Sequence, residues 1–166
     1  NRIVFEYERD ESKDPAHTWD RLYPKTIRYV DYERNGATKF LVEVGFEWNK
    51  ARPDPTFECR AGFELRTAWR CERIAVTMHP PGVEPILQKT WELRYEQAKG
   101  NNASILVGVR VVGHDVEATP TKEEMPELVL GYGAFTPKTT KFQRVEGPAL
   151  PYNAAEHGAY ELVDLF

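Results

Sequence analysis

Apolar and polar residues alternate with a period of two through the segment 40–48. One parity holds five large apolar residues: Phe40, Val42, Val44, Phe46 and Trp48. A strand places alternate residues on one face, whereas helical spacing would scatter these side chains around the axis. The preceding segment 26–32 is also rich in β-branched and aromatic residues. Asn35 and Gly36, between the two segments, adopt positive φ easily, so the pattern predicts a β-hairpin.

The longest alternation runs from Phe57 to Cys71, with charged residues at most of the intervening positions. At Glu72 the parity changes, and the apolar series continues to Met78 with the opposite phase. A shift of one residue is typical of a β-bulge. The pattern therefore predicts one continuous strand over 57–71 followed by a bulge. A helix over 61–75 is the alternative, which the length of the alternation disfavours.

A second hairpin is predicted from the segments 87–95 and 105–112, because Lys99-Gly100-Asn101-Asn102 between them has turn chemistry. The segment 105–112 is nearly all apolar, which is typical of a central strand. Further strands are expected at four places: Ile3–Tyr7, Leu128–Phe135, Lys141–Val145 and Tyr160–Phe166.

Proline-rich segments separate the predicted strands, at 52–55, 79–85, 119–126 and 147–151. Proline fixes φ and lacks an amide donor, so we expect rigid, extended connections between sheets. With about eight to ten strands and no convincing helix, the prediction is an all-β, antiparallel β-sandwich, jelly-roll-like, in a single domain over 1–166. One core is expected to contain Trp48, Trp69, Phe46, Phe63 and Leu93.

Composition narrows the function classes. The 166 residues are 41% hydrophobic, and 22 Lys and Arg against 26 Asp and Glu give a net charge of -4. This composition excludes a disordered linker and favours a soluble globular domain. No apolar run reaches the roughly 18 residues of a membrane helix, so no membrane span is expected. Arginines alternate with aromatic residues over 58–73, but interleaved glutamates match their charge, so we expect a ladder of opposite charges rather than nucleic-acid binding.

The two cysteines are too few for a disulfide scaffold. Cys59 and Cys71 would lie about 40 Å apart on a continuous strand, far beyond the roughly 7 Å that a disulfide spans. We therefore predict two buried free thiols, which favours a reducing compartment or a virion over secretion. Asn102-Ala103-Ser104 forms an N-glycosylation acceptor in a predicted turn.

Catalytic signatures are missing from the chain. The four histidines (His17, His79, His114 and His157) are widely separated, without the spacing of two or four by which one element presents paired metal ligands. No nucleophile elbow or phosphate loop is present. The sequence thus predicts no catalytic residue, no metal and no cofactor. The candidate binding residues lie in loops and at strand ends: His79, His114, Tyr132, Tyr152 and His157.

Three functions remain open on these grounds. The first is a non-enzymatic structural or interaction module, a sandwich subunit of a larger assembly such as a viral coat or spike, with a protein partner or self-association. The second is a β-barrel carrier with an apolar or sugar-like ligand, whose cavity would use inward aromatics at Phe40, Phe46, Trp48, Phe63, Trp69 and Trp91. The third is a cupin-like metal-dependent enzyme. The missing catalytic signatures favour the first.

Overall fold

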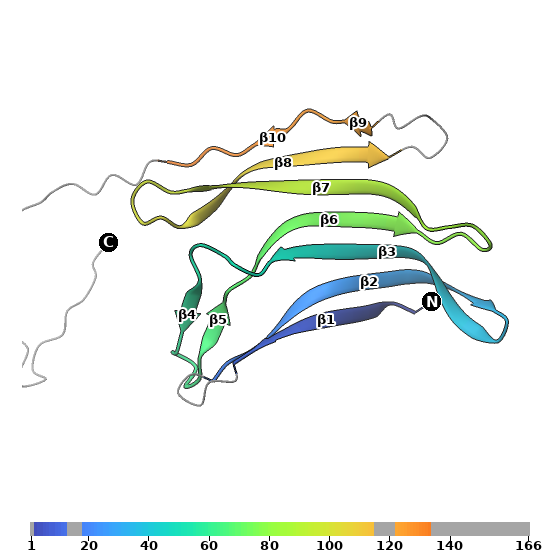
Figure 1. The fold of residues 1–166 in the computed structure, drawn as a ribbon, viewed down its shortest axis with the longest axis horizontal. Coiled ribbons are helices and arrows are strands. Elements are labelled where there is room, and N and C mark those ends of the chain that lie inside the picture. Colours follow the sequence, from blue (N-terminus) through green and yellow to red (C-terminus); the bar gives the residue numbers. More distant parts are fainter. Residues whose placement is uncertain (1, 13–17, 115–121, 134–166) are drawn as a thin grey trace, which may run out of the picture. The chain divides into compact units, whose positions relative to one another are not determined.

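The structure is a computed structural model that describes residues 2–12, 18–114 and 122–133. These residues form ten strands and no helix, and every strand pairing is antiparallel (Figure 1). The strands are β1 (Val4–Glu11), β2 (Asp20–Arg34), β3 (Ala37–Asn49), β4 (Thr56–Glu58), β5 (Leu65–Thr67), β6 (Arg70–Met78), β7 (Ile86–Gln97), β8 (Ser104–His114), β9 (Lys122–Glu124) and β10 (Leu128–Val129). The predicted all-β, antiparallel class is confirmed.

Eight strands form the main sheet, in the order β1-β2-β3-β6-β7-β8-β10, with β9 also pairing with β8. β4 and β5 form a separate two-stranded sheet between β3 and β6 in the chain (Figure 1). The order of the main sheet follows the chain, except that β4 and β5 stand between its neighbouring strands β3 and β6 and that β9 and β10 both pair with β8. The proline-rich segment 52–55 does lead from one sheet to the other, but 79–85 joins the neighbouring strands β6 and β7.

Both predicted hairpins are confirmed. β2 and β3 meet at Asn35 and Gly36, whose φ angles are 53° and 71°. β7 and β8 meet at a turn in which Asn102 has a φ of 55°. The predicted bulge is also present: Glu47 pairs with Arg73 and Trp48 pairs with Cys71, so Glu72 is the extra residue.

The prediction of a continuous strand over 57–71 is wrong. Phe57 pairs with Arg66 in the β4–β5 hairpin, and the Gly62 amide donates to the Cys59 carbonyl at 3.0 Å in the intervening turn. Gly62 has a φ of 85°, which residues with a side chain rarely adopt. The chain therefore turns at Gly62, although the alternation of apolar and charged residues continues through this position.

Few apolar side chains are fully buried among the described residues, and the two aromatic ones lie together at one end of the strands. Trp69 is 8% exposed and Tyr23 is 3% exposed, and their rings stack with centroids 4.6 Å apart. Trp48 is half-buried beside Tyr23, with 5.0 Å between the ring centroids. The predicted core is otherwise wrong: Phe63 is 61% exposed in the β4–β5 hairpin, and neither Phe46 nor Leu93 is fully buried.

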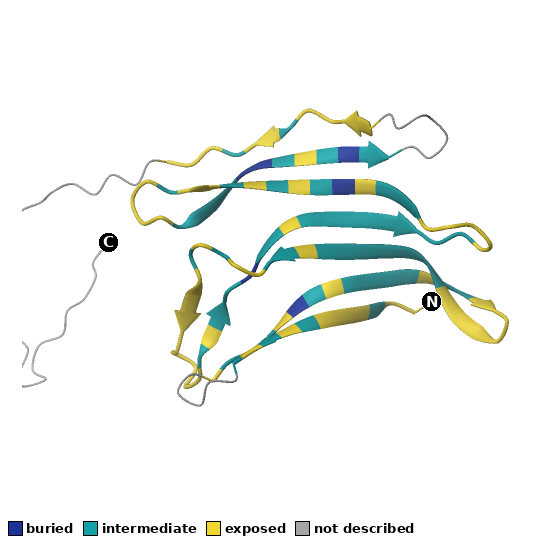
Figure 2. Ribbon diagram, in the orientation of Figure 1, coloured by how far each residue is buried: buried dark blue, intermediate teal, exposed yellow. Residues whose placement is uncertain are grey.

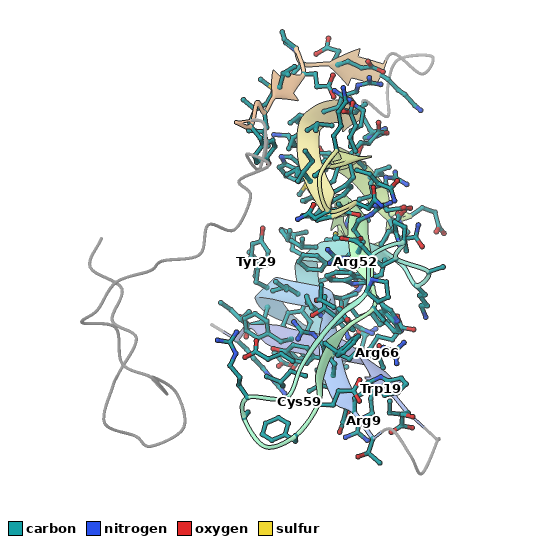
Figure 3. The ribbon with its side chains drawn as sticks, turned by 90° about the vertical axis from the view of Figure 1, so that its left-hand side faces the viewer. Arg9, Trp19, Tyr29, Arg52, Cys59 and Arg66 are labelled. Carbon is teal, nitrogen blue, oxygen red and sulfur yellow. The ribbon has the colours of Figure 1, made fainter. Side chains whose placement is uncertain are left out.

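The cysteines do not form a disulfide, in agreement with the prediction. Their environments differ, however, because Cys59 is exposed on the β4–β5 hairpin and only Cys71 is half-buried. Figure 3 shows Cys59 on this hairpin, with Arg66 and Trp19 close together nearby. The guanidinium carbon of Arg66 lies 4.1 Å from the centre of the Trp19 ring.

The described residues all lie within one compact unit, Asn1–Phe135. A single domain over 1–166 stays a prediction. At the expected strand 128–135, only Leu128–Val129 is a strand among the described residues. The strands expected at 141–145 and 160–166 lie outside the described residues.

Candidate interaction surface

One face of the main sheet is largely apolar across seven strands. Residues that pair directly in antiparallel strands share a face, so the register groups side chains into cross-strand rows. The rows extend from β1 to β10. We call them the apolar face, and its residues are Phe5, Ile27, Val44 and Val76; Tyr29, Val42, Met78 and Ile86; Phe46, Ile74, Trp91 and Val111; and Leu93, Val109 and Leu128. The row that contains Val76 continues to the exposed Lys89 on β7.

No residue of the apolar face is fully buried. Phe5 is 55% and Leu128 is 61% exposed, and the others are half-buried by their neighbours within the sheet (Figure 2). Within the described ranges, therefore, no second layer covers this face. An uncovered apolar surface is unfavourable in water by about 25 cal/mol per Å², and large exposed apolar patches mark interaction sites.

The opposite face is charged. Its clearest row is Glu47–Arg73–Glu92–Arg110, in which opposite charges alternate across β3, β6, β7 and β8. Arg73 Nη1 lies 3.1 Å from Glu47 Oε1. Side chains project from both sides of the sheet (Figure 3). A charge ladder was expected from the sequence, and Arg73 belongs to it, but its partners come from strands far apart in the chain.

Further exposed apolar residues lie along the β1 edge of the sheet. Ile3 is 59% and Tyr7 is 53% exposed, and Leu22 on the neighbouring strand is 55% exposed. Among the described strands, β1 pairs only with β2. Its outer edge therefore adds unpaired backbone groups to an apolar margin.

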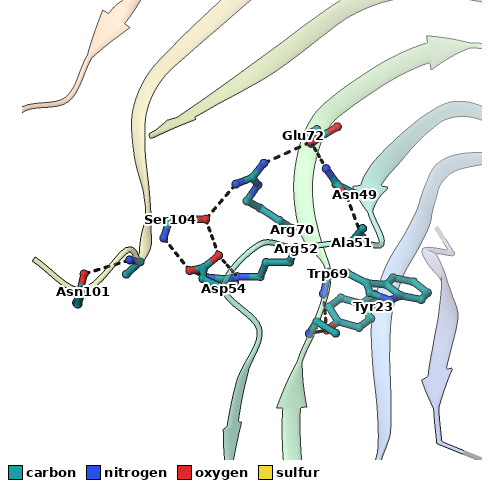
Figure 4. Close-up of polar contacts among 12 residues, drawn as sticks. Tyr23, Asn49, Ala51, Arg52, Asp54, Trp69, Arg70, Glu72, Asn101 and Ser104 are labelled. Carbon is teal, nitrogen blue, oxygen red and sulfur yellow. Dashed lines mark hydrogen bonds and ion pairs between the residues drawn. The ribbon is translucent and has the colours of Figure 1, made fainter. Parts of the chain in front are cut away.

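A polar cluster fixes the connection between the two sheets to the start of β8 (Figure 4). Arg52 holds Asp54 through two hydrogen bonds, Nε to Oδ1 at 2.9 Å and Nη2 to Oδ2 at 3.0 Å. Asp54 also accepts from the amide and the hydroxyl of Ser104, at 2.7 and 2.5 Å. The hydrogen bonds from Arg52 and then from Ser104 hold the pKa of the Asp54 carboxyl far below its usual value.

The candidate binding residues of the described part do not come together. His79 lies just after β6, where its carbonyl accepts from Tyr32 Oη at 3.4 Å. His114 Nε2 lies 3.1 Å from Thr90 Oγ1 at the end of β8. Tyr132 donates to the Leu106 carbonyl at 2.7 Å, near the start of β8. Tyr152 and His157 lie outside the described residues.

Two further sequence features can be placed. Asn102 is exposed in the β7–β8 turn, as its accessibility to glycosylation requires, although the Ser104 hydroxyl of the same motif is bound to Asp54. In the described ranges, no three His, Cys, Asp or Glu side chains are placed to hold a metal ion. No helix in those ranges has the length and apolar character needed to cross a membrane.

The sequence pattern predicted the apolar face of the sheet but not that this face is uncovered in the described residues. Period-two alternation identifies an apolar face, but it does not say whether a second sheet covers that face. The sequence interpretation assumed such a cover and assigned Phe46 and Leu93 to a core. The polar cluster was also missed, because Asp54 and Ser104 are far apart in the sequence and the segment 52–55 was interpreted only as a rigid loop.

Comparison with known proteins identifies a similar fold but no family. No protein-family model matches the chain, and no curated protein does. Among solved structures, the chain is similar to the N-terminal domain of effector protein SpvB from Salmonella typhimurium strain LT2, with a TM-score of 0.57 and 16% sequence identity. The match covers 68% of this chain and 47% of that chain, so this chain spans about half the length of the solved structure. At this identity the likeness concerns the fold alone.

Proposed function

We propose that this chain is a non-enzymatic interaction module whose apolar face packs against another folded protein surface. The observation that carries the proposal is the apolar face itself, fifteen residues that no second layer covers within the described ranges. A sheet that is apolar on one face is stable when that face is buried against another element. The opposite face carries the charge ladder, so a sheet docked through its apolar face keeps these charges in water.

The structural likeness supports a role within a larger protein or assembly. The similar solved chain is the N-terminal domain of an effector protein, and more than half of it lies beyond the matched part. By analogy of fold alone, we infer that the sheet is one layer of a larger arrangement. The separate positions of His79, His114 and Tyr132 give this module no catalytic constellation among them.

The test uses two adjacent residues of β6 that lie on opposite faces. Val76 belongs to the apolar face, whereas Thr77 pairs with Glu43 on the charged face, and both are half-buried. We would prepare Val76→Lys and Thr77→Lys in the 166-residue chain. Each variant would be examined for unfolding stability in urea, for binding of an apolar fluorescent dye, and for size by sedimentation over a range of concentrations.

If the apolar face is a docking surface, the wild-type chain binds the dye and self-associates as its concentration rises. Val76→Lys then reduces both, and the free energy of unfolding changes by under about 1 kcal/mol, because the new charge remains in water. Thr77→Lys leaves dye binding and association unchanged. A loss of more than about 3 kcal/mol in Val76→Lys, or a wild-type monomer that does not bind dye, contradicts the proposal, since Val76 would then be in a covered core.

A further inference from the structure

A pocket of about 330 Å³ opens at the end of the strands where the buried aromatic residues gather. It lies outside the rows of the apolar face. Its walls include four aromatic rings: Tyr23 from β2, Trp48 from β3, Tyr95 from β7 and Trp69, which immediately precedes β6. Two of these walls are fixed by hydrogen bonds. Tyr23 Oη accepts from the Ala68 amide at 3.0 Å, and Trp48 Nε1 donates to the Pro24 carbonyl at 2.8 Å.

The polar lining of the pocket is cationic. Arg21, Arg52 and Arg70 contribute to it, and none of the described lining residues carries a carboxylate. The charge of Arg52 is matched by Asp54, through the two hydrogen bonds described above. Arg21 lies with its guanidinium carbon 5.6 Å from the centre of the Tyr23 ring. The charge of Arg70 is matched by Glu72, at 3.6 Å. The pocket therefore joins apolar walls to three arginines, two of which are paired with carboxylates outside its lining.

One edge of the Arg70 guanidinium has an ion pair with Glu72 but no hydrogen bond. Its Nη1 donates to Ser104 Oγ at 3.0 Å, and its guanidinium carbon lies 4.6 Å from the centre of the Tyr95 ring (Figure 4 shows the bond to Ser104). Nε is buried without a hydrogen-bond partner, and Nη2 forms an ion pair with Glu72 Oε1 at 3.6 Å, beyond hydrogen-bond length. Nε and Nη2 together form the fork with which arginine binds a carboxylate through two parallel hydrogen bonds.

We propose that this pocket binds a carboxylate carried on an apolar, ring-sized group. The carboxylate would displace the Glu72 side chain, which is 49% exposed, from the Nε–Nη2 edge of Arg70, and Arg21 would add attraction for the negative charge. The apolar group would pack against the rings of Trp48 and Tyr95. A carboxylate fits better than a phosphate, because the planar fork of Arg70 matches two carboxylate oxygens and four aromatic rings line the same pocket. The proposal is independent of the apolar face.

Trp48 and Trp69 supply the signal for a binding experiment, because both line the pocket. The probes are phenylacetate, phenethylamine and 2-phenylethanol, which carry the same ring with a negative, positive or neutral group. We expect a saturable change in tryptophan fluorescence with phenylacetate in the millimolar range and no saturation with the other two. Equal responses to all three probes would show an apolar pocket without recognition of charge, and would overturn the proposal.

The source of the carboxylate is distinguished by a peptide arm. A tripeptide that ends in phenylalanine would be compared with its C-terminal amide. Binding of the free-acid peptide at least as tightly as phenylacetate identifies a chain terminus as the ligand. Binding of phenylacetate alone identifies a free aromatic acid. Failure of both to saturate overturns the proposal.

Two arginine variants and one matched control complete the test. Arg70→Gln is expected to weaken phenylacetate binding by about tenfold or more, because the fork is lost. Arg21→Gln, which removes the charge that lies over the Tyr23 ring, is expected to weaken it several-fold and keeps the test open if Arg70→Gln does not fold. Arg110→Gln removes an exposed arginine of the charged ladder and should not alter binding. Unchanged affinity in both pocket variants would refute the assignment.

Discussion

Gly36 has a backbone conformation that sets the register of the first hairpin. Its φ is 71°, and a side chain added there would meet no atom within 4 Å, so any cost of substitution comes from the backbone. We predict that Gly36→Val destabilises the fold by on the order of 1 kcal/mol or more. Gly45, which also has free space but lies within β3 without a positive φ, is the matched control.

Gly45→Val should leave the free energy of unfolding unchanged or raise it, because a β-branched residue suits a strand. Urea denaturation of the two variants measures the difference. Equal stability of Gly36→Val and the wild type would show that the turn accommodates a side chain by changing its conformation.

The ionisation of Asp54 makes the stability of the fold depend on pH. Its pKa is lower in the folded chain than in the unfolded chain, because Arg52 and Ser104 bind the ionised form. The ionised carboxylate therefore stabilises the fold above the unfolded pKa of about 4, and this stabilisation is lost as pH falls below that value. We predict that Asp54→Asn lowers stability by about 1–3 kcal/mol near neutral pH and that its difference from wild type shrinks in acid.

Urea unfolding at several pH values checks this prediction. Asp20→Asn is the control, because the Asp20 side chain is 54% exposed and forms its ion pair with Arg9 at the surface. The control should stay close to the wild type at neutral pH. A difference for Asp54→Asn that stays constant from neutral pH into acid would mean that the ionised form is not what stabilises the cluster.

At the scale of elements, the sequence predicted pairing where turn chemistry and alternation agree. Asn35-Gly36 and the turn at 99–102 located two hairpins, and the parity change at Glu72 located a bulge. The segment 57–71 failed because both arms of a hairpin can continue one alternation through a turn. Phe57 and Leu65 keep the same parity although they belong to opposing strands. Gly62 indicated a turn and the alternation indicated a continuous strand, and the sequence alone did not decide between these two signals.

The β4–β5 hairpin gives the two cysteines different reactivities. Cys59 is exposed on it, whereas burial raises the pKa of the half-buried Cys71 thiol and leaves less thiolate. We predict that iodoacetamide alkylates Cys59 much faster than Cys71 in the native chain. Mass spectrometry of digested samples measures both rates, and both thiols should react fully after denaturation without reductant. Equal native rates would contradict the placement of Cys71.

At the scale of the whole molecule, the sequence predicted an all-β chain with antiparallel strands, but not how the strands are layered. Each strand displays its own apolar parity, and the register then unites residues as distant as Phe5 and Val76 into one row. Alternation within a strand shows which side chains share a face, but it does not show which other element packs on that face. The same limit applies to the pocket, because Arg21, Trp48 and Arg70 come from three strands.

An uncovered apolar face has a thermodynamic consequence for the chain alone. The heat capacity of unfolding grows with the apolar surface that unfolding exposes, and ordinary globular domains show about 12–15 cal/mol/K per residue. Because the apolar face is already in water, we predict a clearly smaller value for the 166-residue chain at low concentration, together with a low urea m-value for its length. Calorimetry measures the first and urea unfolding the second, and Val76→Lys should change neither. Ordinary values in the dilute monomer would mean that the face is covered within the free chain, and docking would then have to involve a different surface.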